Sequence, residues 1–156
     1  MILIPAPCLK KIRAAAEAAY PDECCGLLIG RDGKAGDVVV TAVAPSPNRA
    51  AADHRDSFEV DPQVRFDVMR RLDRKNARGG APERIVGHYH SHPDHAAEPS
   101  ARDLEMAYEP DLLWLIVAVA EGRAADTRAH RLDETAGRFR EVEIAVADRP
   151  TKTKSN

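Results

Sequence analysis

Two histidines separated by one residue, then a serine and an aspartate, constrain this chain more than any other feature. The residues are His90, His92, Ser100 and Asp103. Two imidazoles and a carboxylate suit a divalent ion such as zinc, and they leave its fourth tetrahedral position to water. To use them together, the fold must bring the aspartate back to the histidines through the loop at residues 93–99. The alternative, from these residues alone, is a solvated turn rich in histidine.

The local structure around this pattern can be predicted from the same segment. A strand over residues 84–90 leads into the histidines, and a regular strand would project both of them from one face. Pro93 cannot donate a hydrogen bond to a sheet, so we expect the strand to end before it and His92 to lie on a loop. Asp103 falls in the first turn of a helix expected over residues 100–108.

A second motif lies far upstream, where Pro21, Glu23, Cys25 and Gly26 enter an apolar run of strand length. Together with the downstream histidines, serine and aspartate, it resembles the JAMM (MPN+) metallopeptidase family. The compact stand-alone prokaryotic members, similar to hydrolases that release amino acids from sulfur-carrier proteins, are the most similar. The resemblance covers residues 1–147 and implies one metallopeptidase domain with a cytidine-deaminase-like MPN fold.

The resemblance implies a zinc ion bound by His90, His92 and Asp103, with Glu23 as the general base. The base would take a proton from zinc-bound water and return it to the departing amine. From the residues alone, Asp22 is an equal candidate for this role, and the family pattern selects Glu23.

Ser100 has two possible roles. By resemblance, it donates its hydroxyl to the oxyanion that forms when water adds to the substrate carbonyl. The Ser-x-x-Asp spacing is also typical of a helix capping box, in which each side chain bonds the backbone N–H of the other residue. These two roles compete for Asp103.

The remaining histidines and the cysteines are given other roles. We expect His88 to pack against neighbouring side chains or to support the metal-binding residues. We expect His95 to be exposed or to face the substrate. The three cysteines, Cys8, Cys24 and Cys25, do not form a disulfide framework and indicate a reducing compartment. A thiolate beside Glu23 could close the open zinc position, although we interpret Cys25 as buried packing.

The chain of 156 residues is long enough for one domain with its own hydrophobic core. Strands and helices are interleaved, but several successive strands are joined by short turns. We therefore expect an α/β (α+β mixed) fold, with a curved, mostly antiparallel mixed sheet flanked by helices. The polar residues 148–156 are expected to form a disordered tail.

The composition limits the classes of partner. A net charge of −2 argues against nucleic-acid binding, and no apolar run approaches the roughly 20 residues that span a bilayer. We expect a cytoplasmic enzyme without membrane contact. By resemblance, its substrate is a bond at the C-terminus of a ubiquitin-like or sulfur-carrier β-grasp protein. The alternative is a catalytically silent MPN scaffold, whereas a zinc deaminase is excluded because its P-C-x-x-C signature is absent.

Overall fold

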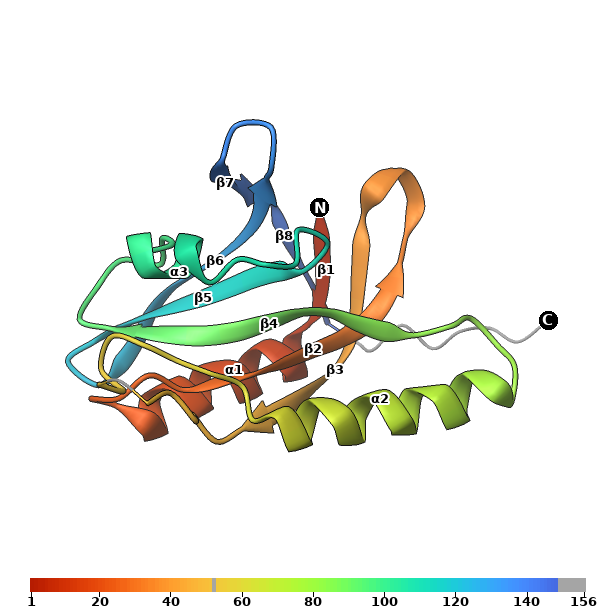
Figure 1. The fold of residues 1–156 in the computed structure, drawn as a ribbon, viewed down its shortest axis with the longest axis horizontal. Coiled ribbons are helices and arrows are strands. Elements are labelled where there is room, and N and C mark those ends of the chain that lie inside the picture. Colours follow the sequence, from red (N-terminus) through yellow and green to blue (C-terminus); the bar gives the residue numbers. More distant parts are fainter. Residues whose placement is uncertain (52, 149–156) are drawn as a thin grey trace.

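The structure, a computed structural model, describes residues 1–51 and 53–148. Residues 149–156, most of the predicted tail, lie outside the described residues. Within the described part of the chain, helices and strands alternate as far as residue 120, and the remaining elements are strands (Figure 1). None of the described helices is long and apolar enough to cross a membrane.

The described residues form helices and strands of very different length. The helices are α1 (Ala6–Ala19), α2 (Pro62–Ala77) and α3 (Ala101–Glu105), and a short 3-10 turn spans Lys34–Gly36. The strands are β1 (Ile2–Pro5), β2 (Cys25–Asp32), β3 (Val38–Ser46), β4 (Arg84–Pro93), β5 (Leu113–Ala120), β6 (Arg123–Asp133), β7 (Arg138–Val142) and β8 (Ile144–Ala147). The two long helices carry a proline in the first turn, where the missing N–H costs no hydrogen bond.

The described strands form one sheet in the order β7-β6-β5-β4-β2-β3-β1-β8. Neighbours pair antiparallel at β2–β3, β2–β4, β5–β6 and β6–β7. They pair parallel at β4–β5, β1–β3 and β1–β8. The predicted mixed, mostly antiparallel sheet flanked by helices is therefore confirmed.

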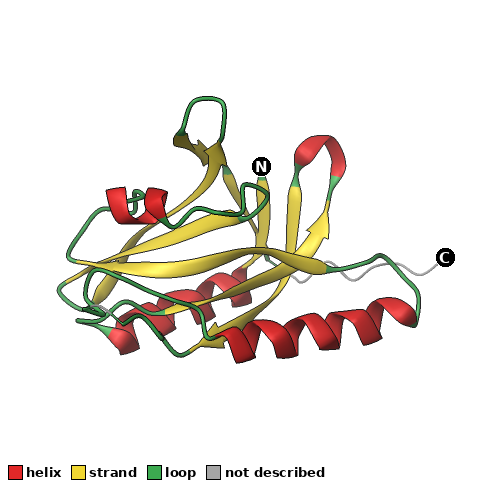
Figure 2. Cartoon of the chain, viewed as in Figure 1, coloured by secondary structure: helices red, strands yellow, loops and turns green. Residues whose placement is uncertain are grey.

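The two faces of the sheet are covered by different helices, as the alternation along β2 shows. Leu28 joins the core that includes Ile12 of α1. Its neighbours Leu27 and Ile29 point to the other face, where they pack with Leu72 of α2. The short α3 lies apart from both long helices (Figure 2). The face opposite α1 is therefore shared between α2 and the segments that surround α3.

β4 runs further than the sequence predicted. It ends at Pro93, so His92 lies on the strand and the prediction of a loop position is wrong. The reason is one-sided pairing: the pairing with β2 stops at Cys25 opposite His90, whereas the pairing with β5 continues to Val119 opposite Pro93. Proline is tolerated in a strand where the side of its missing N–H has no partner strand.

Gly87 pairs with Leu113 across the parallel strands β4 and β5. A Cβ atom at this glycine would lie 2.3 Å from the carbonyl oxygen of Leu113, so one strand would have to shift. We predict that Gly87→Ala lowers the free energy of unfolding by about 1–3 kcal/mol, measured by urea denaturation. The control Gly33→Ala, where the nearest atom is 3.3 Å away, should change it by less than about 0.5 kcal/mol. Equal effects of the two substitutions would contradict this account.

Candidate metal centre and active site

Three buried side chains converge on one point beside β4. The Nε2 atoms of His90 and His92 lie 3.0 Å apart, and Oδ2 of Asp103 lies 3.4 Å from the first and 3.2 Å from the second. The two histidines share a face because residues two apart in a strand project to the same side. Asp103 comes from the first turn of α3, as the sequence predicted. Together they form a buried group that could hold a metal ion.

The spacing of these three atoms fits a tetrahedral ion such as zinc. Zinc binds histidine nitrogen and carboxylate oxygen at about 2.0–2.2 Å, which places tetrahedral ligand atoms about 3.3–3.6 Å apart. The three separations of 3.0–3.4 Å lie close to that range without any rearrangement of the backbone. Three protein ligands also leave one position open, which distinguishes catalytic zinc sites from structural ones.

The two imidazole rings are oriented by their surroundings. Nδ1 of His92 lies 2.9 Å from the carbonyl oxygen of Ala96, so this nitrogen donates and Nε2 keeps its lone pair for a metal. The ring of His90 stacks on Phe58, with the ring centroids 4.1 Å apart. Nδ1 of His90 is buried and has no hydrogen-bond partner among the described residues.

Ser100 and Asp103 form the capping box that their spacing predicted. Oγ of Ser100 accepts a hydrogen bond from the N–H of Asp103 (3.0 Å), and Oδ2 of Asp103 accepts one from the N–H of Ser100 (2.8 Å). The same Oδ2 faces both histidines, so the cap and metal binding share one oxygen and are compatible. Ser100 is exposed, and because its oxygen is the acceptor in the cap, its own proton remains available to a further acceptor.

Burial and close polar contacts determine the charge of Asp103 and His90, two of the converging groups. Burial acts to raise the pKa of Asp103, but its close contacts with the rings of His90 and His92, together with the hydrogen bond from the N–H of Ser100, outweigh it and hold that pKa well below its usual range. Burial also lowers the pKa of His90, which favours the neutral ring. A charged carboxylate beside a neutral imidazole is the state that binds metal ions.

Glu23 is a further buried carboxylate of the centre. It directly precedes Cys24 and the start of β2, and it is 5% exposed. Its Oε2 has no hydrogen-bond partner among the described residues. Burial, together with the negative charges of Asp103 and Asp56, raises the pKa of Glu23 to about 9. A cation in the centre would favour the ionised form, because a nearby positive charge lowers a carboxyl pKa.

The backbone on both sides of Glu23 is fixed by hydrogen bonds. Its N–H donates to the carbonyl oxygen of His54 (2.6 Å), and its carbonyl accepts from Nδ2 of Asn48 (3.2 Å). The next N–H, of Cys24, donates to Oγ of Ser91 (2.8 Å), a buried residue between the two converging histidines. Asn48 and Ser91 were not predicted from the sequence, because both are far along the chain from the backbone groups that they bind and only the fold brings them together. The competing candidate Asp22 is exposed.

The adjacent cysteines point to opposite faces of the sheet. Cys24 packs against the core on the α1 face. Sγ of Cys25 lies 3.6–3.8 Å from the carbonyl oxygens of Ser46, Pro47 and Glu59. Burial raises the pKa of the Cys25 thiol to about 12, so the thiol stays protonated. Neither cysteine belongs to the described group that could hold a metal, which supports the interpretation of Cys25 as packing.

The other histidines near the centre have separate surroundings. The ring of His88 packs edge-on against Trp114, with centroids 4.3 Å apart, in agreement with the predicted packing role. His95 is exposed in the loop after β4. His130 of β6 is buried and holds the same loop through a 2.9 Å contact between Nε2 and the carbonyl oxygen of Ala97. His130 was not predicted from the sequence, and the only signal for it is its place in a segment of strand-like alternation.

Comparisons with known sequences identify relatives of this chain. A family model described as prokaryotic homologs of the JAB domain matches residues 5–133. A desampylase of Haloferax volcanii is 36% identical over 138 residues, which cover 88% of this chain and 88% of that protein. A CysO-cysteine peptidase of Mycobacterium bovis is 27% identical over 135 residues, which cover 85% of this chain and 83% of that protein.

Solved structures resemble this chain over nearly its whole length. The solution structure of a protein from Desulfitobacterium hafniense has a TM-score of 0.81 at 29% identity and covers 97% of this chain and 96% of its own. The crystal structure of a JAB1/MPN domain protein from Archaeoglobus fulgidus has a TM-score of 0.54 at 22% identity. The match covers 93% of this chain and 96% of that protein, and at this identity it shows similarity of fold alone. The predicted MPN fold is confirmed, and the chain belongs to the family of prokaryotic homologs of the JAB domain.

Proposed function

We propose that this protein is a zinc metallopeptidase that hydrolyses a peptide or isopeptide bond at the C-terminus of a small β-grasp protein, ubiquitin-like or a sulfur carrier. The convergence of His90, His92 and Asp103 at near-tetrahedral spacing carries the proposal. The names of the relatives, a desampylase and a CysO-cysteine peptidase, support a substrate of this class. The three unpaired cysteines agree with a reducing, cytoplasmic setting.

His90, His92 and Asp103 would hold the zinc ion through their Nε2, Nε2 and Oδ2 atoms. When bound, zinc would polarise the substrate carbonyl and lower the pKa of a water molecule to about 7. The hydrogen bond from His92 to Ala96 and the stacking of Phe58 on His90 would keep both rings in place for this task.

Glu23 would act as the general base and then as the general acid. Its carboxylate would accept a proton from the attacking water and pass it to the departing amine, so that the C–N bond breaks with a neutral leaving group. Oε2 is suited to this because it has no competing hydrogen bond among the described residues. The fixed backbone at His54 and Asn48 would limit the movement of the carboxylate between the two proton transfers.

Ser100 would stabilise the charge that develops on the substrate oxygen. Its Oγ is held by the N–H of Asp103, and its hydroxyl proton remains free to point toward that oxygen. Removing one such donor typically costs about 10²–10³ in rate.

A catalytically silent scaffold is the alternative function. Against it, the complete set of groups is present, and burying polar side chains without partners costs stability. A protein that served only for assembly would lose nothing by replacing these groups with apolar ones.

The zinc assignment can be tested by metal analysis. The purified protein should hold about one zinc per chain, and the double variant His90→Ala/His92→Ala should hold almost none, because two of three ligands are gone. His95→Ala, which removes an exposed histidine in the next loop, should keep its zinc. Circular dichroism should show that all variants remain folded, since a domain of this size has its own core. Full zinc content in the double variant would refute the site.

The reaction and its base can be tested on carrier proteins. Ubiquitin-like and sulfur-carrier proteins that bear a C-terminal amino acid, or a lysine in isopeptide linkage, would be incubated with the zinc-loaded enzyme and followed by mass spectrometry. Glu23→Gln should retain zinc but lose about 10²-fold or more in kcat, because the proton acceptor is removed. The exposed neighbour Asp22→Asn should retain activity.

The possible failures of this experiment are distinct. If the zinc-loaded protein cleaves no carrier of either class, the proposed substrate is wrong. If Asp22→Asn is the inactive variant instead, the substrate class stands and the assignment of the base is wrong.

A further inference from the structure

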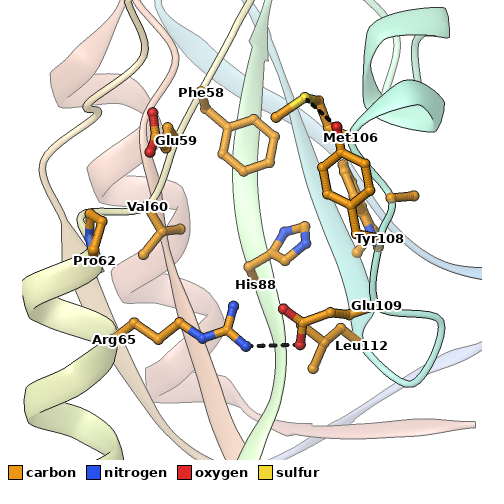
Figure 3. Close-up of a pocket in the computed structure, with 12 residues that line it drawn as sticks. Phe58, Glu59, Val60, Pro62, Arg65, His88, Met106, Tyr108, Glu109 and Leu112 are labelled. Atoms are coloured by element: carbon orange, nitrogen blue, oxygen red, sulfur yellow. Dashed lines mark hydrogen bonds and ion pairs between the residues drawn. The ribbon is translucent and has the colours of Figure 1, made fainter.

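A hollow of about 290 Å³ lies beside the metal centre, between the start of α2 and the segment that joins α3 to β5. Figure 3 shows the His88 ring pointing into it between Phe58, Tyr108 and Leu112. This volume is just below the range of about 300–1,000 Å³ for small-molecule sites, so the hollow suits a side chain better than a cofactor.

The hollow is connected to the metal centre through shared walls. Phe58 and Met106 line both this hollow and a second one, whose lining includes Asp103. The Phe58 ring also stacks on His90. A substrate chain bound at the metal centre can therefore reach the hollow by passing Phe58 and Met106.

The distance along β4 indicates which substrate residue reaches the hollow. The ring centroids of His88 and His90 lie 6.5 Å apart. An extended chain advances about 3.3 Å per residue, so this distance corresponds to about two residues. Consider a substrate chain that runs along β4 with one of its residues at the metal centre. The side chain that enters the hollow would then belong to a residue about two positions away in the substrate.

The lining of the hollow favours an apolar side chain. Val60, Leu112 and Trp114 contribute apolar surface. The charged pair Arg65 and Glu109 neutralises itself through a 2.8 Å ion pair, drawn as a dashed line in Figure 3. Glu59, also part of the lining, leaves a negative charge that disfavours an acidic occupant.

The position of Glu23 indicates which side of the scissile bond enters the hollow. The charges of Asp103, Asp56 and Arg102 act on the Glu23 carboxylate, and two of these residues, Asp103 and Arg102, line the second hollow. The amine that takes a proton from Glu23 therefore belongs on the side of the second hollow. The acyl side of the substrate is left to run toward His88.

We infer that the hollow is a specificity subsite for one apolar side chain of the substrate's acyl-side tail, two residues before the residue that carries the scissile carbonyl. This inference rests on the proposed function and adds a sequence preference to it. A tail with leucine at that position should be preferred over tails with alanine or aspartate.

The binding test uses the protein's own fluorescence. The chain has one tryptophan, and Trp114 lines the hollow at 3% exposure. Peptides that match the acyl product, with leucine, alanine or aspartate two residues before the C-terminal residue, would be titrated into the zinc-loaded full chain. The leucine peptide should change the Trp114 emission and bind about tenfold or more tightly than the alanine peptide, with the aspartate peptide weakest, since even one methylene in an apolar pocket is worth at least about tenfold.

A variant that fills the hollow provides the matched comparison. Ala107 lines the hollow, so Ala107→Phe should weaken the leucine peptide by about tenfold or more and leave the alanine peptide within about twofold. Ala81→Phe, at an exposed position before β4, is the control. On carrier substrates, kcat/KM should follow the same order.

Each contrary result overturns a different statement. Equal affinity for the leucine and alanine peptides in the unmodified protein would overturn the subsite, even if Ala107→Phe failed to fold. A leucine preference found only on the amine side would overturn the assigned direction. If the leucine peptide binds selectively but the zinc-loaded protein cleaves no carrier, the proposed function fails while the apolar subsite stands.

Discussion

Side chains along β4 alternate between the two faces of the sheet, and both faces are covered. Tyr89 enters the core beneath α1, while His90 and His92, one and three residues further along β4, project to the other face. A shift of one residue in the pairing of β4 would exchange these two sets and bury the imidazoles in an apolar core. The register of β4 between β2 and β5 therefore fixes the candidate metal centre and the hydrophobic core at the same time.

The two buried carboxylates of the centre differ in their surroundings. Asp103 receives hydrogen bonds from its neighbours, and its pKa is lowered, whereas the desolvated Glu23 has a pKa raised to about 9. In the proposed mechanism this difference would divide the tasks, because Asp103 would stay charged to bind the ion while Glu23 would exchange protons. The division follows from position: Asp103 faces the histidines from α3, and Glu23 lies at the entry to β2 with an unpartnered Oε2.

Much of the fold and the converging residues could be predicted from sequence, because periodicity and spacing are local. The His90 and His92 spacing, the capping box of Asp103, and the mixed sheet all follow from short-range patterns. The prediction for His92 failed because proline was judged without knowing which side of β4 lacks a partner. The hydrogen bonds of Asn48 and Ser91 join segments far apart in the chain, so no local pattern predicts them.

The shortness of α3 has a consequence for how the centre is assembled. A helix of five residues has too few hydrogen bonds to form by itself in water. Asp103 is thus carried by a segment that its own capping box supports locally and whose order depends on docking through the contacts of Oδ2 with both histidines. If an ion binds here as proposed, part of its binding energy would go into ordering this turn of the chain. The affinity for that ion and the local opening of α3 would then be thermodynamically coupled, so that a change in one changes the other.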